Sequence, residues 1–203
     1  MAARQSSPPC APLGLLLLLI GVISCHLPEV QARPRDFWCN PQARKTMERR
    51  TEGLRKDMAA CVGENTLPSP VQLPCVSINT TEWTNKTLWQ KHAEVVEALQ
   101  VFQDGVQGVK DQTTSGCLTS LLEKLEHHIT NYLAIVSSVQ IQNDTVTPSQ
   151  SAAQNCSSSS STNEVLKQYE NLLQGKLERF VADLRKDISK TEHRTNNSKA
   201  ACS

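Results

Sequence analysis

The chain is poor in the features that mark several protein classes. Aromatic residues account for only 4% of its 203 residues. They are not interleaved with basic residues, which excludes a stacking surface for single-stranded nucleic acid. The formal net charge is +1, so no overall field attracts a nucleic acid or an anionic membrane. Basic residues do gather between positions 33 and 56, but Glu48 and Glu52 alternate with them, which is typical of a solvated helix face.

The sequence also lacks the residue spacings that carry chemistry. No two cysteines form a Cys-X-X-Cys pair, and the scattered histidines do not complete a metal-site spacing. His127 and His128 diverge by roughly 100 degrees on a helix, so they cannot chelate one ion together. No nucleophile with a base and no paired carboxylates occur at a supporting spacing. We therefore expect that the protein is not an enzyme and that it binds no cofactor and no metal.

Only one long apolar run is present, at residues 13–23, and its length of about 11 residues is too short for a permanent membrane-spanning helix. It follows Arg4 and precedes a small residue suited to cleavage, which is the arrangement of a signal peptide. We expect residues 1–32 to be that signal and residues 33–203 to form one secreted, extracellular domain without membrane insertion. A bacterial lipidation motif ending at Cys25 is the competing interpretation.

Six of the eight cysteines follow the expected signal. An even number in an exported chain favours disulfides, although sequence alone allows many pairings. Five Asn-X-Ser/Thr motifs also follow it and lie outside the apolar stripes, where a glycan can be solvated. The candidate acceptors are Asn79, Asn85, Asn143, Asn155 and Asn196.

Four segments carry apolar residues at helical spacing. We expect helices at about residues 41–61, 82–110, 116–140 and 163–190. The second is the strongest amphipathic signal, and we expect His92 on its stripe to be a hydrogen-bonded residue at the border of the core. The first has only a narrow apolar stripe, and it contains Gly53, which lowers helix stability by about 1 kcal/mol relative to alanine. The Ser-rich stretch 149–161 cannot bury enough apolar surface to order itself, so we expect a mobile connection there.

The connections between these segments run long, short, long. A short link forces two helices antiparallel, whereas a link of about 20 residues spans a helix and leaves its neighbours parallel. The spacing therefore predicts an all-α four-helix bundle with up-up-down-down topology and two long crossovers. At its poles this topology brings Cys39 towards Cys202 and Cys61 towards Cys117, which leaves Cys75 with Cys156 on the crossovers. Each bridge should stabilise the fold by about 2 to 4 kcal/mol.

Several short stretches carry a family resemblance. They are Cys61, Leu67-Pro68-Ser69-Pro70-Val71, Leu73-Pro74, Glu82-Trp83, Cys117-Leu118-Thr119-Ser120-Leu121-Leu122 and Leu172-Leu173-Gln174-Gly175-Lys176. Over roughly residues 39–180 the chain resembles the erythropoietin/thrombopoietin family of four-helix cytokines, and its thrombopoietin branch more closely. Cys75 and Cys156 look like additions to the family pattern. The chain also ends without the long glycosylated tail of mammalian thrombopoietins.

The resemblance implies a secreted hematopoietic cytokine that is a monomer when free. It would dimerise a single-pass class I cytokine receptor of the thrombopoietin-receptor type, trigger kinase signalling and promote growth of the megakaryocyte/thrombocyte lineage. In this family the high-affinity face comes from the fourth helix and the first crossover. Carried over to matching positions, the receptor-binding residues are Lys167, Asn171, Gln174, Gly175, Lys176, Pro74, Ile78 and Glu82. Gln174 stands where the family has a basic residue. Asn40, Gln42 and Thr46 replace charged contacts, so no second-face residues are carried over.

Two alternative functions stay open at this point. One is an erythropoietin-like hormone for red-cell production, and the other is a secreted helical carrier of an apolar ligand, which needs an open internal pocket instead of a close-packed core. On the fourth helix, Lys167, Asn171, Gln174 and Glu178 share a polar flank that a receptor could read. We further expect Lys176→Glu to leave folding intact while weakening receptor binding by a few kcal/mol.

Overall fold

Four long helical segments dominate the computed structural model of the chain, which describes residues 34–61, 65–139, 141 and 155–195. The elements in order are α2 (Pro34–Cys39), α3 (Pro41–Ala60), β1 (Thr66–Pro74), α4 (Thr80–Asn85), α5 (Leu88–Lys110), α6 (Gly116–Ser137), β2 (Asn155–Ser161), α7 (Thr162–Leu172), the π-helical turn η1 (Leu173–Leu177) and α8 (Glu178–Thr195). The last three form one continuous helical segment. No helix among these described residues is long and apolar enough to span a membrane.

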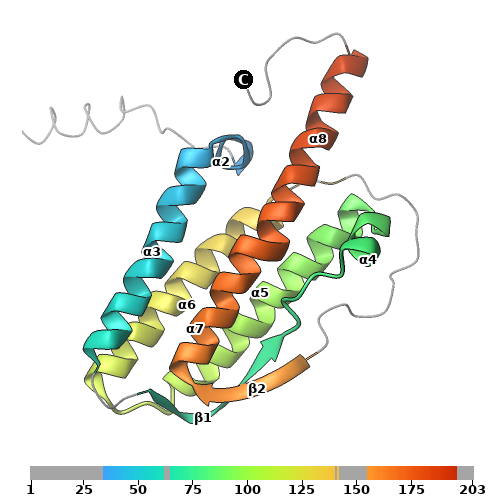
Figure 1. The fold of residues 1–203 in the computed structure, drawn as a ribbon. Coiled ribbons are helices and arrows are strands. Elements are labelled where there is room, and N and C mark those ends of the chain that lie inside the picture. The colour runs from blue at the N-terminus through green and yellow to red at the C-terminus, as the bar shows by residue number, and fades with distance from the viewer. Residues whose placement is uncertain (1–33, 62–64, 140, 142–154, 196–203) are drawn as a thin grey trace, which may run out of the picture. The chain divides into compact units, whose positions relative to one another are not determined.

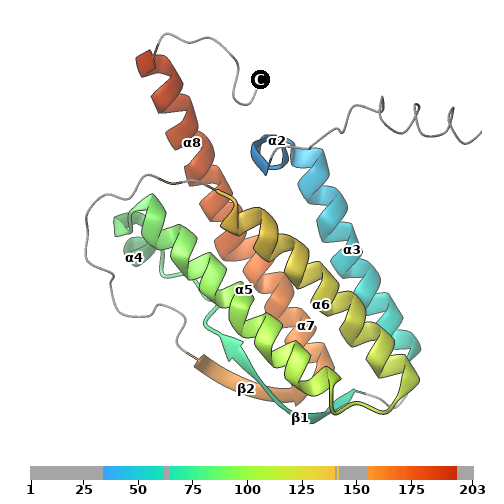
Figure 2. The ribbon, with the colours of Figure 1, turned by 180° about the vertical axis from the view of Figure 1, so that it is seen from behind.

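The helices have the topology that the connection lengths predict. Helices α3 and α5 run in one direction, and α6 and the α7–η1–α8 segment run in the other, as both views show (Figure 1 and Figure 2). The link from α5 to α6 is short, whereas the α3–α5 and α6–α7 links are long crossovers. The predicted disulfide-stabilised four-helix bundle is therefore confirmed as the fold class.

Capping residues decide where the helices begin. Asn40 caps α3 by accepting hydrogen bonds from the backbone of Gln42 and Ala43 at 2.9 and 3.1 Å. Thr87 and Gln90 form a reciprocal capping box at the start of α5. Each cap satisfies backbone donors that the first turn of a helix leaves unpaired.

Some observed boundaries differ from the expected ones. The second segment does not run unbroken from residue 82, because it is divided into α4 and α5 around Lys86 and Thr87. The fourth begins at Thr162, with Ser161 as its cap, one residue before the expected start at 163. The third ends at Ser137 and the fourth continues to Thr195.

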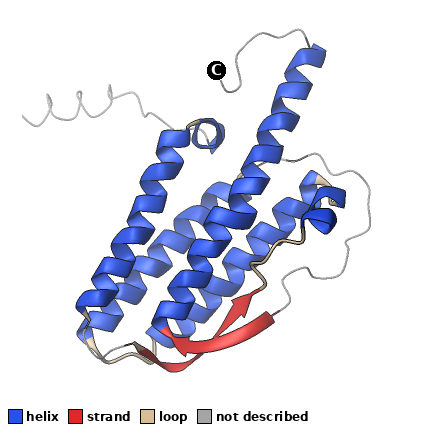
Figure 3. Ribbon diagram, viewed as in Figure 1, coloured by secondary structure: helices blue, strands red, loops and turns tan. Residues whose placement is uncertain are grey.

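The expectation of a mobile connection across the Ser-rich stretch is wrong for residues 155–161. They form β2, which pairs antiparallel with β1 in a two-stranded sheet (Figure 3). These two are the only strands among the described residues. Val71 pairs with Ser159, and Leu73 pairs with Ser157. Backbone hydrogen bonds to an apolar partner strand, together with a disulfide, order a segment that has little apolar surface of its own.

The structure contains the Cys61–Cys117 and Cys75–Cys156 disulfides, with Cα–Cα distances of 5.8 and 5.1 Å. The first joins the end of α3 to the start of α6, and the second joins the two crossovers. Cys39 is also disulfide-bonded, but its expected partner Cys202 lies outside the described residues.

Large side chains fill the interior between the helices. Phe102, Tyr169 and Phe180 are fully buried, and so are the leucines and valines that surround them. The hollow that lies between β1 and α5 is an open groove of about 390 Å³ at the surface, lined by Ser69, Asp104 and Gln112 among others. In the part of the chain that the structure describes, these buried side chains make up a close-packed core.

Strand β1 approaches α5 closely at one point. A Cβ atom added to Gly105 would lie 2.6 Å from Cγ1 of Val71, which is closer than real Cβ contacts allow. Val71 is 1% exposed. The absence of a side chain at Gly105 is therefore what lets the first crossover lie against the bundle.

Candidate functional site

The first crossover meets the fourth helical segment at Gly175. A Cβ added there would lie 3.7 Å from Cδ1 of Ile78 and 3.9 Å from the carbonyl oxygen of Val76. Two segments that are about 100 residues apart in sequence thus lie in contact. This contact joins the crossover residues and the helix residues that the family resemblance implies.

The eight expected receptor-binding residues differ in exposure. Lys167, Asn171, Gln174 and Glu82 are exposed, Gly175 and Ile78 are half-buried, and Pro74 and Lys176 are buried. The exposed helix residues form a strip on α7 and η1 beside the crossover. We call Lys167, Asn171, Gln174, Ile78 and Glu82 the candidate face.

Lys176 does not belong to this exposed set. Its side chain is 4% exposed, and its Nζ donates hydrogen bonds to the carbonyl oxygen of Cys75 at 2.5 Å and to the carboxylate of Glu94. Lys176→Glu would place a second buried carboxylate beside Glu94. Lys176 is thus buried and not exposed as the expectation of intact folding requires, so the substitution should disturb folding. Helical periodicity alone does not reveal that this side chain points inward.

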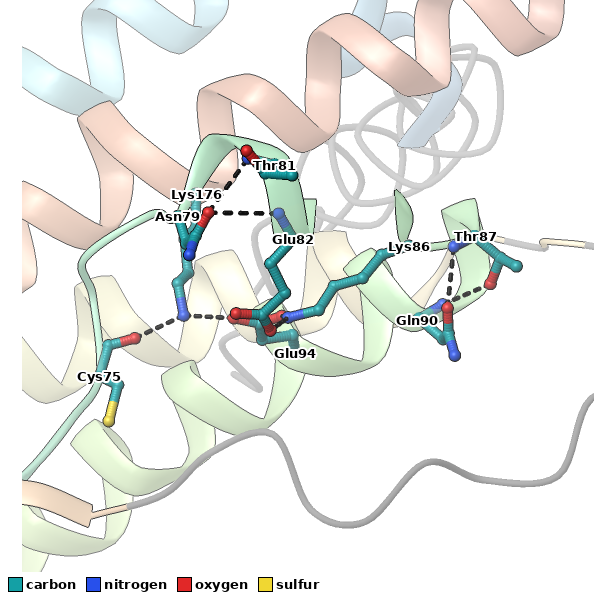
Figure 4. Close-up of polar contacts among 9 residues, drawn as sticks. All are labelled: Cys75, Asn79, Thr81, Glu82, Lys86, Thr87, Gln90, Glu94 and Lys176. Atoms are coloured by element: carbon teal, nitrogen blue, oxygen red, sulfur yellow. Dashed lines mark hydrogen bonds and ion pairs between the residues drawn. The ribbon is translucent and has the colours of Figure 1, made fainter. Parts of the chain in front are cut away.

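Lys176 is one end of a chain of alternating charges. Glu94, whose side chain is 5% exposed, also accepts a hydrogen bond from Lys86 at 2.7 Å, and Lys86 in turn pairs with Glu82 at 2.7 Å. Figure 4 shows this row of contacts, which runs from Lys176 in the fourth helical segment past Glu94 of α5 to Lys86 and Glu82 at α4. It connects the buried pair to Glu82 of the candidate face, so the crossover is held to both helices by ion pairs.

The charge chain shifts the pKa values of its outer members. The hydrogen bond from Lys86 lowers the pKa of Glu82, and the nearby positive charges of Lys86 and Lys176 act in the same direction. Desolvation opposes the charge on Lys86, but its hydrogen bonds to Glu82 and Glu94 outweigh this and raise its pKa. Both groups therefore keep their charges at neutral pH.

Trp83 provides a second anchor for the crossover. Its side chain is 5% exposed, and the Nζ of Lys91 lies 5.7 Å from the centre of its ring. The same ammonium pairs with Asp183 of α8 at 2.9 Å. A cation over an indole ring and a buried aromatic side chain both favour one position of α4 against α5 and α8.

The helix is locally widened where it meets the crossover. Gly175 and Lys176 both lie in the π-helical turn Leu173–Leu177. Such turns are rare and frequently occur at functional sites. Here the turn places the glycine against Ile78, while the next residue reaches Glu94.

Sequence reasoning missed Glu94, Lys86 and Lys91 as parts of this site. Glu94 and Lys91 are 4% and 8% exposed, although charged residues are seldom buried unless they are paired. Their position next to the apolar stripe of α5 is a signal that could have marked them. The charge partners come from distant segments, and periodicity cannot identify those.

The candidate glycan acceptors have different surroundings. Asn79 is exposed and caps α4, and Asn85 is exposed at the last position of α4. Asn155 begins β2, whereas Asn143 and Asn196 lie outside the described residues.

His92 and His128 have structural partners. Nε2 of His92 lies 2.9 Å from the carbonyl oxygen of Val136. His128 is buried, with Nδ1 3.0 Å from the hydroxyl of Tyr169 and Nε2 3.1 Å from the carbonyl oxygen of Met47. Within the described part of the chain, no group of three or more His, Cys, Asp or Glu residues could hold a metal ion.

Comparison with known proteins adds an independent finding. The family model described as erythropoietin/thrombopoietin matches residues 37–187. Thrombopoietin of Rattus norvegicus is 26% identical over 113 residues, which cover 56% of this chain and 35% of that protein. Thrombopoietin of Mus musculus is 26% identical over 117 residues, covering 58% and 31%. Erythropoietin of Tetraodon nigroviridis is 23% identical over 170 residues, covering 84% of this chain and 94% of that protein. The chain thus spans about a third of the length of the thrombopoietins that it matches.

Proposed function

Because the chain belongs to the erythropoietin/thrombopoietin family of hematopoietic cytokines, we propose that it is a secreted hormone of the thrombopoietin type. It binds a class I cytokine receptor through the candidate face and brings two receptor copies together. Their associated kinases then signal for growth of the megakaryocyte/thrombocyte lineage. Free in solution, the hormone is a monomer.

One observation carries this proposal. Ile78 of the crossover lies against Gly175 of the helical segment, so the exposed strip of Lys167, Asn171 and Gln174 adjoins the crossover as one surface. An apolar side chain surrounded by polar ones is the usual composition of a protein interface. These are also the two segments from which the family builds its high-affinity face.

The structure supports a face that is rigid before binding. The Lys176–Glu94 pair and the buried Trp83 tie the crossover to the bundle, and the Cys75–Cys156 bridge ties it to the second crossover. A surface that is already ordered loses less conformational entropy on association, which strengthens binding. This supports the assignment of the face to recognition.

An erythropoietin-like function is the second candidate. The Tetraodon nigroviridis erythropoietin is covered along 94% of its length, whereas the rat and mouse thrombopoietins are covered along 35% and 31%. The thrombopoietins have the higher identity over the shared segment, 26% against 23%. Receptor choice between the two hormones is therefore the question that an experiment must decide.

Reporter cells that express either the thrombopoietin receptor or the erythropoietin receptor test both candidates. We expect dose-dependent signalling through the thrombopoietin receptor alone. The signal should decline at high hormone concentration, because each receptor copy then binds a separate hormone molecule and no receptor pair forms. Signalling only through the erythropoietin receptor would establish the second candidate instead. Silence of both reporters would refute the proposed function.

A pair of matched variants tests the candidate face. Gln174→Glu places a charge on the exposed strip, and Gln107→Glu makes the same change at an exposed site of α5. We expect the first to reduce receptor affinity by about tenfold, a typical effect at an interface position, and the second to leave it unchanged. Equal affinities would remove the strip from the receptor contact.

A further inference from the structure

Asn79 has two roles that meet in one side chain. It is the first residue of the acceptor motif Asn79-Thr80-Thr81, and it is the N-cap of α4. Its Oδ1 accepts hydrogen bonds from the backbone nitrogens of Thr81 and Glu82 at 3.1 and 3.3 Å. Figure 4 shows the side chain turned towards these two residues.

The cap is compatible with glycosylation. An N-glycan is attached to the amide nitrogen of asparagine, whereas both capping bonds use the amide oxygen. Attachment therefore leaves the acceptor atom and its two bonds in place. Asn79, Thr80 and Thr81 are all exposed, so a glycan there can extend into solvent from the folded protein.

The position of Asn79 gives such a glycan a specific consequence. Ile78, which lies against Gly175, is its direct neighbour, and Glu82 is bonded to its side chain through the backbone. Both belong to the candidate face. A bulky, strongly hydrated glycan at this point would cover the crossover half of the face and hinder close approach of a partner.

We propose that Asn79 is an N-glycosylation site whose glycan covers the crossover half of the candidate face and lowers receptor affinity. The glycosylated and unglycosylated forms are then two hormones of different potency from one chain. This inference rests on the proposed function, because it requires passage through the secretory route and a receptor at this surface.

Two substitutions at Thr81 separate the glycan from the cap. Thr81→Ala destroys the acceptor motif, and Thr81→Ser keeps it, while both retain Asn79 and the backbone nitrogen that it caps. The full chains are produced in the same glycosylating animal cells. Mass spectrometry of the peptide that contains Asn79 gives its occupancy, and thermal unfolding compares the two folds. Binding is measured to immobilised extracellular domains of the thrombopoietin and erythropoietin receptors.

We expect the wild type and Thr81→Ser to carry a glycan at Asn79, and Thr81→Ala to lack it with the same unfolding temperature. Thr81→Ala should bind receptor about tenfold more tightly, mainly through faster association, because the unobstructed face is available in every encounter. Asn79→Asp is a second variant without a glycan, since aspartate caps a helix as well as asparagine does. Asn79→Asp should show the same gain in receptor affinity as Thr81→Ala.

The failures can be told apart. An unoccupied Asn79 in the wild type and in Thr81→Ser, or equal affinities of Thr81→Ala and Thr81→Ser, would overturn the inference while the receptor function stands. If no form, glycosylated or not, binds either receptor domain, the proposed function fails and the inference fails with it.

Discussion

The ammonium group of Lys176 and the carboxylate of Glu94 form an ion pair in the interior, with side chains that are 4% and 5% exposed. The same ammonium bonds to the backbone of Cys75 at 2.5 Å. A buried pair is weak evidence for stability, because desolvation of both charges offsets their attraction. Removal of Lys176, in contrast, takes away the buried cation and leaves Glu94 paired with the more exposed Lys86.

Lys176→Met should therefore destabilise the protein by about 1.5 to 3 kcal/mol, because Glu94 loses its buried partner and keeps only the ion pair with the more exposed Lys86. Chemical denaturation measures this loss. Lys176→Met combined with Glu94→Leu should recover much of it, since no buried charge is then left unpaired. Lys167→Met on the exposed strip is the control and should change stability by less than about 0.5 kcal/mol. A Lys176→Met protein as stable as this control would contradict the interior role of the pair.

Gly105→Ala should destabilise the protein by about 1 to 3 kcal/mol, because its Cβ would meet the stiff, buried side chain of Val71 at 2.6 Å. Gly108→Ala is the matched control on the same helix, since nothing lies within 4 Å of its Cβ. It should stabilise by about 0.5 to 1 kcal/mol through helix propensity alone. Thermal unfolding of the two variants compares them directly, and a shift of the same sign in both would be inconsistent with the close contact.

His128 should make stability depend on pH. Burial lowers the pKa of this imidazole from its usual 6.5, and the nearby charge of Arg50 acts in the same direction. In the neutral ring Nε2–H donates to the carbonyl of Met47, and Nδ1 accepts from the hydroxyl of Tyr169. As pH falls, the unfolded chain therefore binds the proton before the folded protein does. The stability that neutral His128 contributes is complete above pH 6.5, and it is lost as pH falls through the lower pKa of the folded state.

The free energy of unfolding, measured from neutral pH downwards, tests this dependence. His128→Gln should flatten the decline just below neutral pH, whereas His127→Gln, at an exposed neighbouring position, should keep it. Identical slopes for the wild type and His128→Gln would rule out His128 as the titrating group.

The Cys75–Cys156 bridge should fix the crossovers locally. Replacing both cysteines by serine should cost about 2 to 5 kcal/mol and accelerate hydrogen exchange in β1 and β2 most strongly, because the pairing then relies on backbone bonds alone. The Cys61–Cys117 double serine variant is the control, and its exchange should rise at the junction of α3 and α6 instead. Unchanged hydrogen exchange in β1 and β2 after loss of the Cys75–Cys156 bridge would contradict this role.

Periodicity was sufficient for the helices and their directions, because an apolar stripe and a connection length are local properties of the chain. It did not predict the break at Thr87, where a capping box overrides a continuous stripe. It also missed β2, because a run of serines is typical of disorder when taken alone. That strand is ordered by residues 66–74, which contain three prolines and do not read as a strand themselves.

The candidate site was only partly predictable for the same reason. The resemblance identified which segments meet, and the contact at Gly175 agrees with it. Whether Lys176 faces solvent or the interior depends on Glu94 and the Cys75 carbonyl, two groups supplied by other segments. The buried Lys91 and Glu94 of α5 likewise depend on partners that no local pattern specifies.

The bridge between the crossovers has a consequence for how the molecule is made. Cys61 and Cys117 are 56 residues apart, whereas Cys75 must wait for a partner 81 residues further along. A growing chain emerges with its amino-terminal part first, so Cys117 leaves the ribosome well before Cys156. During that interval Cys75 is a thiol close in sequence to Cys61 and exposed to a wrong pairing. The crossover that carries Ile78 and Glu82 is thus among the last parts to be locked during biosynthesis.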